Sequence, residues 1–149
     1  MCRFIFFKVS LFIFAQLNKL KLRVLKYFYL ILWVSLIVFA SLCNANSIPK
    51  IQLFEHFDKV VHFVMYFGAS LFSIPFFTFH KNYKRSFLFA FFFSVLLGIT
   101  MEILQYSITE NRSADLFDVL ANIFGSIVGI IVYQIFIKNR RIEKIFFRI

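Results

Sequence analysis

Charged residues are scarce in this chain of 149 residues, of which only 16% are charged. Soluble domains typically carry about 25%. Cysteine is scarce as well, because the chain contains only Cys2 and Cys43 and has no CxxC or Cys/His pattern with metal-ligand spacing. We therefore expect neither a disulfide framework nor a cysteine-ligated metal site.

Apolar residues dominate instead: 61% of the chain is hydrophobic, and 25 residues are Phe. A soluble core of this length could not bury so much apolar side chain. The composition predicts an all-α integral membrane protein with one compact domain, whose main partner is the lipid bilayer. The net charge of +10 stands in short basic clusters beside apolar runs, so a nucleic-acid partner is not expected.

Four apolar runs predict a bundle of four transmembrane helices, each near the roughly 20 residues that a bilayer requires. The expected helices cover residues 24–43, 60–79, 86–104 and 116–137, which gives a membrane domain over residues 24–137. Residues 1–23 precede this domain as an interfacial helix or a loosely ordered leader, and residues 138–149 follow it as a basic tail. Tyr27, Tyr29 and Trp33 are expected to form an aromatic belt at one interface.

The distribution of charge predicts the orientation of this bundle. Residues 1–26 carry six basic residues, the turn at 80–85 carries three and the tail carries five, so 14 of the 17 basic residues lie on one side. The positive-inside rule makes that side cytoplasmic and places both termini there. Six of the seven acidic residues fall on or near the opposite, outer side.

Polar residues are concentrated at the three helix ends that this topology brings to the outer face. Asp58, His62 and Tyr66 are spaced by four residues and share one helix face. A charged group near the bilayer costs a few kcal/mol, so Glu102 is expected to face inward toward a partner such as Arg112, which can bind a carboxylate through two hydrogen bonds. The predicted cluster is Asp58, Lys59, His62, Tyr66, Glu102, Gln105, Arg112, Asp115, Asp118 and Asn122.

Each of these residues also has a purely structural interpretation. Asp115 suits the N-cap of the fourth helix, and Asp118 suits the positive N-terminal end of that helix. Asn122 can bridge helices, Lys59 can extend its amine to the membrane surface, and His62 can be a satisfied interfacial histidine. The cluster is predicted because these residues come from three helix ends that meet at the outer face.

Glycines predict close helix contacts. Gly125 and Gly129 form a G-x-x-x-G pattern within an apolar run, which allows two helices to approach closely. We expect this pattern, together with Gly68, to pack helices within one chain rather than to form a dimer interface.

The spacing of the polar residues and glycines resembles the VanZ-like family over residues 49–137. The matching positions are Asp58, Lys59, His62, Phe63, Tyr66 and Gly68; Glu102 and Gln105; and Arg112, Ser113, Asp115, Asp118, Val119, Ala121, Asn122, Gly125 and Gly129. The resemblance implies a multi-pass protein of the bacterial inner membrane with a role in the cell envelope. The family is named for a protein linked to teicoplanin resistance, which does not imply that this chain confers resistance.

Two functions follow from these residues. In the first, the outer-face cluster binds a head group or a cell-wall-related ligand without catalysis. In the second, the protein is a membrane-embedded enzyme for a lipid-linked or peptidoglycan-derived substrate, with His62 as acid or base oriented by Asp58. Glu102 would then be a second acid or base or a metal ligand, and Arg112 would hold a phosphate or carboxylate of the substrate. Asp, Glu and His can hold a divalent cation, but no established ligand spacing is present, so no metal and no cofactor are predicted.

Overall fold

The computed structural model describes residues 16–17, 24–25, 27–42, 56–78, 82–108 and 115–147. Most of the N-terminal segment 1–23 and the loop residue Arg112 lie outside the described residues. Within the described ranges the chain is helical and contains no strand. The all-α prediction is confirmed to this extent.

Among the described residues, three helices are long and apolar enough to cross a membrane. They are α2 (Phe57–Phe77), α3 (Tyr83–Ile108) and α4 (Leu116–Val132), which continues as the π-helical turn η1 (Tyr133–Ile137). A shorter apolar helix, Tyr27–Leu42, precedes them. A helix satisfies its own backbone hydrogen bonds, which lipid cannot do, so apolar runs of this length adopt this form. A second π-helical turn, η2 (Glu143–Phe147), follows in the tail.

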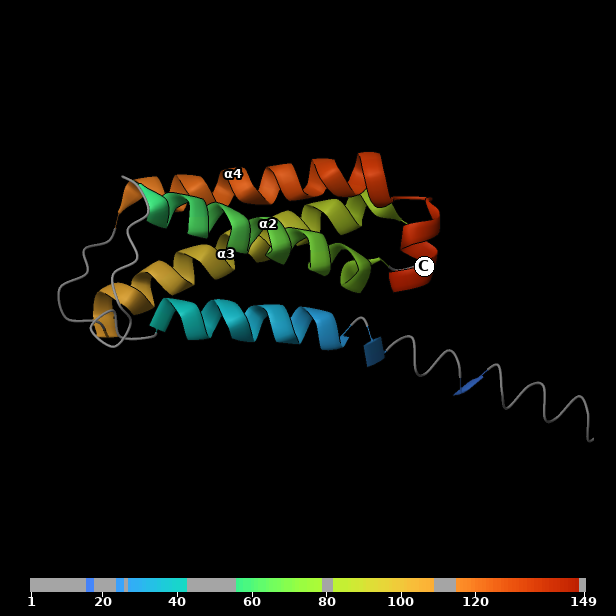
Figure 1. Ribbon diagram of the computed structural model, residues 1–149, viewed down its shortest axis with the longest axis horizontal. Coiled ribbons are helices and arrows are strands. Elements are labelled where there is room, and N and C mark those ends of the chain that lie inside the picture. Colours follow the sequence, from blue (N-terminus) through green and yellow to red (C-terminus); the bar gives the residue numbers. More distant parts are fainter. Residues whose placement is uncertain are drawn as a thin grey trace, which may run out of the picture.

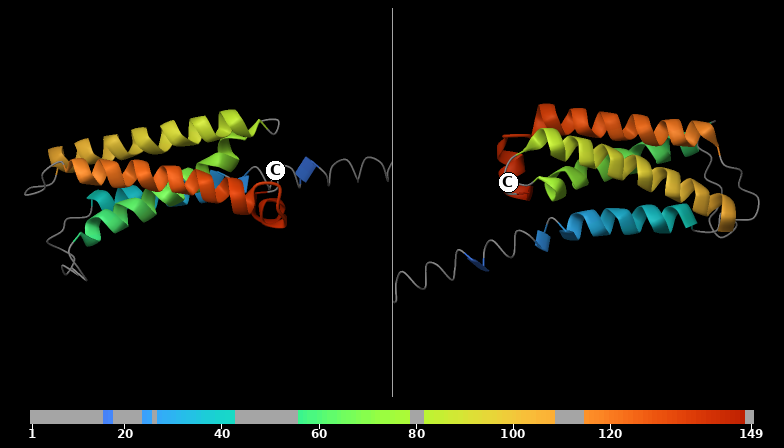
Figure 2. Two further views of the ribbon diagram at one scale, coloured as in Figure 1. Left: turned by 90° about the horizontal axis from the view of Figure 1, so that it is seen from above. Right: turned by 180° about the vertical axis from the view of Figure 1, so that it is seen from behind.

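The helices run side by side as a bundle, with α2 in contact with both α3 and α4 (Figures 1 and 2). Glycines of α4 make its approach to α2 close. A Cβ atom added to Gly125 would collide with the backbone carbonyl of Phe63, and one added to Gly129 would collide with Ser70 and the backbone of Phe67. The G-x-x-x-G pattern therefore faces α2 within the same chain.

Serines join the helices below the polar end of the bundle. The hydroxyls of Ser94 on α3 and Ser126 on α4 lie 2.7 Å apart, and Ser126 also donates to the carbonyl of Asn122. The Ser94 hydroxyl also lies 3.3 Å from the carbonyl oxygen of Tyr66 on α2. Small hydroxyl residues allow close packing and satisfy each other where no water is available, so they connect all three long helices.

The Tyr27–Leu42 helix is attached to α2 through Trp33. The indole Nε1 donates to the carbonyl of Met65 at 2.8 Å, and the ring lies where a side chain on Gly68 would be. Trp33 therefore makes an interhelical contact with α2. Tyr29 likewise stacks on Phe72 of α2, with ring centroids 6.2 Å apart.

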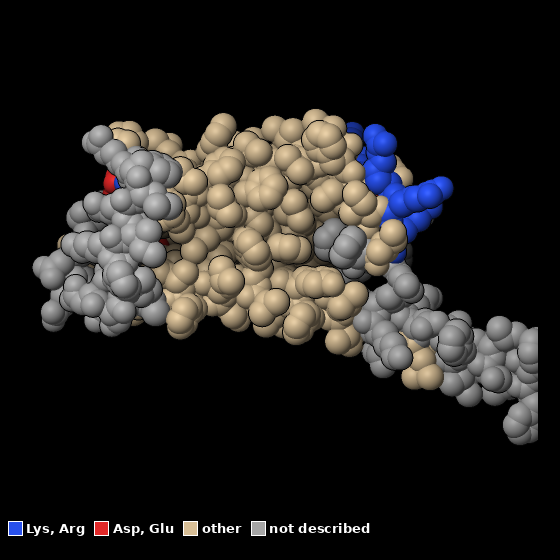
Figure 3. All heavy atoms as spheres, viewed as in Figure 1, with Lys and Arg blue, Asp and Glu red and all other residues tan. Residues whose placement is uncertain are grey.

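The face of the bundle seen in Figure 3 shows no charged side chain along its length, and the charged side chains that are visible lie at its two ends. Large side chains on α3 and α4 are more than half exposed, for example Leu96, Ile103 and Phe124, and Val60 and Val64 on α2 are nearly half exposed. Such a continuous apolar surface is stable only when lipid covers it. Together with the helix lengths, it identifies the chain as a membrane protein.

The tail is held at the end opposite the polar cluster by Glu143, which is only 2% exposed. Its carboxylate accepts hydrogen bonds from the hydroxyls of Tyr83 at 3.1 Å and Tyr133 at 2.8 Å and from the backbone N–H of Asn139 at 2.6 Å. Lys138 lies over the Tyr83 ring, 4.7 Å from its centroid. Glu143 is the one acid among the basic residues of the tail in the sequence, and no local pattern predicts its role.

Replacing Gly125 by Ala tests the α2–α4 contact. The added Cβ meets backbone atoms of Phe63, so the variant should lose about 1–3 kcal/mol of stability through overpacking, reduced by about 1 kcal/mol of gained helix propensity. Gly98→Ala is the matched control, because its Cβ would meet only side chains, Asn122 and Tyr66, at 3.1–3.3 Å. Thermal unfolding in detergent micelles should rank Gly125→Ala below Gly98→Ala; the reverse order would contradict this packing.

Candidate functional site

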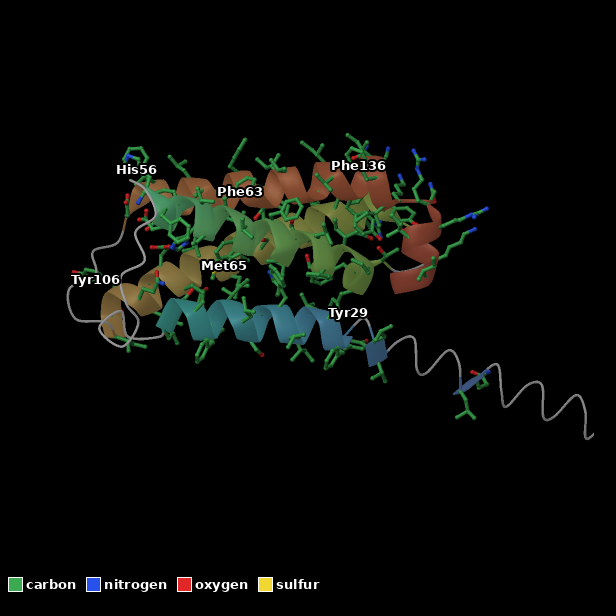
Figure 4. The ribbon with its side chains drawn as sticks, viewed as in Figure 1. Tyr29, His56, Phe63, Met65, Tyr106 and Phe136 are labelled. Atoms are coloured by element: carbon green, nitrogen blue, oxygen red, sulfur yellow. The ribbon has the colours of Figure 1, made fainter. Side chains whose placement is uncertain are left out.

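The N-terminal end of α2, the C-terminal end of α3 and the N-terminal end of α4 lie at the same end of the bundle (Figures 1 and 4). His56 and Tyr106 mark this end in Figure 4, and Phe136 marks the other. Most of the predicted cluster gathers here. We describe it as an outer layer around Lys59 and a buried layer around His62.

The outer layer is centred on the amine of Lys59. Its Nζ lies 2.8 Å from Asp58 Oδ2, 2.5 Å from Asp115 Oδ2 and 2.9 Å from Asp118 Oδ1. The lysine side chain is 23% exposed, so solvent screens these contacts only in part. One cation on α2 thus holds the N-terminal end of α4 through two of its carboxylates.

The buried layer is centred on the ring of His62, which is 5% exposed. Its Nδ1 lies 3.0 Å from Asn122 Oδ1 on α4 and 3.5 Å from Glu102 Oε1 on α3. Its Nε2 lies 3.9 Å from Asp118 Oδ2. Side chains from three helices therefore meet around one imidazole.

Tyr66 extends the buried layer by one helical turn. Its ring lies parallel to that of His62 at an angle of 7°, with centroids 6.5 Å apart. Among the described residues, neither the Tyr66 hydroxyl nor the Asn122 amide nitrogen has a hydrogen-bond partner, although both residues are at most 2% exposed. Gly98 leaves room for both groups, since a Cβ there would lie 3.1 Å from the amide nitrogen. A buried donor without an acceptor is costly, so these two groups mark a place for an acceptor.

Asp115 acts as the N-cap of α4, as the sequence predicts. Its Oδ1 accepts a hydrogen bond from the backbone N–H of Phe117 at 2.9 Å, while Oδ2 binds Lys59. The hydrogen bond from Lys59, followed by that from Phe117, holds the pKa of Asp115 below its ordinary value of 3.8. Both contacts favour the charged carboxylate.

Two predicted residues, Gln105 and Asp58, lie apart from the His62 contacts. Gln105 on α3 donates its amide to the carbonyl of Ser41 at 2.9 Å, which satisfies a free carbonyl at the end of the Tyr27–Leu42 helix. Asp58 pairs with Lys59, whereas the residues around His62 are Asn122, Glu102 and Asp118. Arg112 lies outside the described residues.

A cavity of about 390 Å³ opens beside the outer layer and is lined by His56, Lys59, Asp115 and Phe117. His56 and Phe117 are not among the site residues predicted from the sequence. The available signal was their position, since His56 directly precedes α2 and Phe117 stands between Asp115 and Asp118. The cavity joins charged groups to an aromatic wall and contacts the polar cluster through Lys59.

Among the described residues at this end of the bundle, negative charge predominates. Among the described residues of the cluster, four carboxylates (Asp58, Glu102, Asp115 and Asp118) accompany a single lysine. The arrangement can bind a cation or an amine, and it places an imidazole next to two carboxylates that can exchange protons with it.

These features define a helical membrane protein with an ionisable cluster at one end of its bundle. A family model described as VanZ/LLP1 matches residues 1–137, and the chain belongs to this family. The match includes the residues 49–137 that carry the resemblance and also the N-terminal part of the chain. Comparisons with curated proteins and with solved structures found no match.

Replacing Lys59 by Gln tests the outer layer. The variant leaves the largely buried Asp118 without its cation, so we expect a loss of about 1–3 kcal/mol of stability, less than for a fully buried pair. Adding Asp118→Asn should restore part of that loss because it removes the orphaned charge. Asp58→Asn, at an exposed position, should change stability by less than about 1 kcal/mol. Equal effects of Lys59→Gln and Asp58→Asn on thermal unfolding would exclude a central role for Lys59.

The lowered pKa of Asp115 predicts how the stability of the folded protein depends on pH. Because its pKa is lowered in the folded protein, its contribution to stability is complete above 3.8 and is lost as the pH falls through the lowered pKa. Asp115→Asn keeps a good N-cap but cannot titrate. The difference in thermal midpoint between the wild type and this variant should be constant from about pH 8 to pH 5 and should shrink below pH 3.8. A difference that grows on acidification would contradict the bridge to Lys59.

Proposed function

We propose that this member of the VanZ family is a multi-pass protein of the bacterial inner membrane that binds a head group or a cell-wall-related ligand at its outer face. The cavity beside Lys59 and Asp115 is the observation that carries the proposal. Its volume of about 390 Å³ falls within the range of small-molecule pockets, about 300–1,000 Å³. The cavity opens at the end of the helices, where a bilayer presents its head groups.

The charges of the cluster favour one chemistry of ligand. Lys59 is already surrounded by three carboxylates, so it offers little attraction to a purely anionic group. The excess of carboxylates instead attracts an amine. Phe117, which is 66% exposed, supplies an apolar wall and can stack on a cationic group. An amine-bearing head group or precursor therefore fits this end best.

The orientation of the bundle supports an outward-facing site. Basic side chains of the tail, among them Arg140, Arg141 and Lys144, are exposed at the end opposite the cavity. The positive-inside rule assigns that end to the cytoplasm. The cavity and its acidic cluster then face the cell envelope.

A second candidate function is a membrane-embedded enzyme acting on a lipid-linked or peptidoglycan-derived substrate. The contact between His62 Nδ1 and Glu102 Oε1, at 3.5 Å, favours it because two acid–base groups lie together in a buried site. Incubation of the purified protein with labelled lipid-linked precursors separates the two candidates. Product that forms with the wild type and not with Glu102→Gln indicates an enzyme, and retention without product indicates a binding protein.

Native mass spectrometry of the full chain released from lipid nanodiscs tests the proposed ligand. With phosphatidylethanolamine and phosphatidylglycerol at equal amounts, the wild type should retain the amine-bearing lipid preferentially. Asp115→Asn should reduce this preference about threefold or more, since it removes one carboxylate from the cavity while keeping the cap of α4.

Glu143→Gln is the matched control, because it neutralises a carboxylate at the other end of the bundle and should leave the preference unchanged. Equal retention of both lipids, or preferential retention of the anionic lipid, would overturn the proposed ligand class.

A further inference from the structure

The buried layer around His62 has the composition of a metal site. His62, Glu102 and Asp118 come from three different helices, and each offers a donor atom within 4.8 Å of the donor atoms of the other two. All three residues are at most 7% exposed. Bonds of about 2.0–2.2 Å to one ion would place such atoms roughly 3.3–4.4 Å apart, so small side-chain movements close the set around an ion.

The orientation of the His62 imidazole leaves Nε2 available to bind a metal ion. Nδ1 lies 3.0 Å from Asn122 Oδ1, which can only accept a hydrogen bond, so Nδ1 carries the proton. Nε2 then holds a lone pair and faces the Asp118 carboxylate at 3.9 Å, too far for a hydrogen bond. A lone pair opposite a carboxylate is unfavourable unless a proton or a metal cation lies between them. A histidine ligand held by a hydrogen bond from its other nitrogen is the usual arrangement in metal sites.

Two buried donors point to the same place. The Tyr66 hydroxyl and the Asn122 amide nitrogen have no hydrogen-bond partner among the described residues. Tyr66 is stacked on His62 and lies within electrostatic range of Glu102. A water or hydroxide bound to an ion in the buried layer supplies an acceptor for such donors.

Asp58, Asp115 and Asp118 in the outer layer form a second group of carboxylates that are close enough together to hold an ion. This group has no room for a metal ion. The Lys59 amine lies 2.5–2.9 Å from one oxygen of each, so a cation already occupies its centre. The buried layer is therefore the part of the cluster that fits a metal.

We propose that His62, Glu102 and Asp118 bind one divalent transition-metal ion of the zinc class at the outer end of the bundle. One imidazole and two carboxylates suit Zn²⁺ or Mn²⁺, whereas Mg²⁺ and Ca²⁺ prefer ligand sets made of oxygen alone. A dication also neutralises two carboxylates that are buried within membrane-spanning helices. Three protein ligands leave a position open for water or another ligand. The site stands on these contacts alone and does not depend on the head-group ligand proposed above.

Metal binding by the full chain tests this inference. The protein, purified without a histidine tag and stripped with a chelator, is titrated with ZnCl₂ in detergent and in excess Mg²⁺ by isothermal calorimetry, and the bound metal is counted by plasma mass spectrometry. We expect one zinc per chain. His62→Gln and Glu102→Gln should each weaken binding by tenfold or more.

The chain offers a matched control for each variant. His56→Gln removes the exposed histidine at the mouth of the cavity, and Glu143→Gln removes a buried carboxylate at the far end; both should bind zinc as the wild type does. X-ray absorption at the zinc edge of the wild type should show nitrogen and oxygen ligands, with one imidazole and no sulfur. This measurement uses the wild type alone, so it tests the site even if the site variants do not fold. Three results would overturn the proposal. The protein could bind no stoichiometric zinc, or the zinc could be ligated by sulfur. The zinc affinity could also be unchanged in His62→Gln and Glu102→Gln and lowered in His56→Gln.

Discussion

The close approach of α4 to α2 is the contact on which the rest of the structure depends. Gly125 and Gly129 lack the side chains that would hold the two backbones apart. Their approach brings Asn122 to 3.0 Å from His62 and brings Asp118 to 2.9 Å from Lys59. In lipid an ionisable group must find its partners within the protein. The apolar packing of two helices therefore makes the polar cluster possible, and the cluster in turn fixes the register of the two helices.

The two ends of the bundle handle charge differently. At the tail, Glu143 has three hydrogen-bond donors arranged around it, which accounts for a buried carboxylate without any ligand. At the cluster, carboxylates outnumber the lysine among the described residues, and two buried donors lack acceptors. The first arrangement is complete and serves to hold the tail. The second is incomplete as a protein-only network, which is why we assign the function to that end.

The sequence predicted the helices and most of the cluster because each rests on a local pattern. Apolar runs mark the spans, and the spacing of Asp58, His62 and Tyr66 places them on one side of α2. The partners of each group depend on helix rotation and tilt, which no local pattern encodes. Sequence spacing paired His62 with Asp58, whereas its contacts are with Asn122, Glu102 and Asp118. The contact of Trp33 with Gly68 likewise depends on the packing of two helices and has no local pattern in the sequence.

The most direct test of the account is the coupling energy between His62 on α2 and Glu102 on α3. It is measured from the unfolding free energies of the wild type, His62→Gln, Glu102→Gln and the double variant in detergent with a chelator present. Residues that share one cluster should show a coupling of about 0.5–3 kcal/mol. Effects that add within about 0.3–0.5 kcal/mol would show that the two side chains do not meet, and would contradict a shared polar cluster at this end of the bundle.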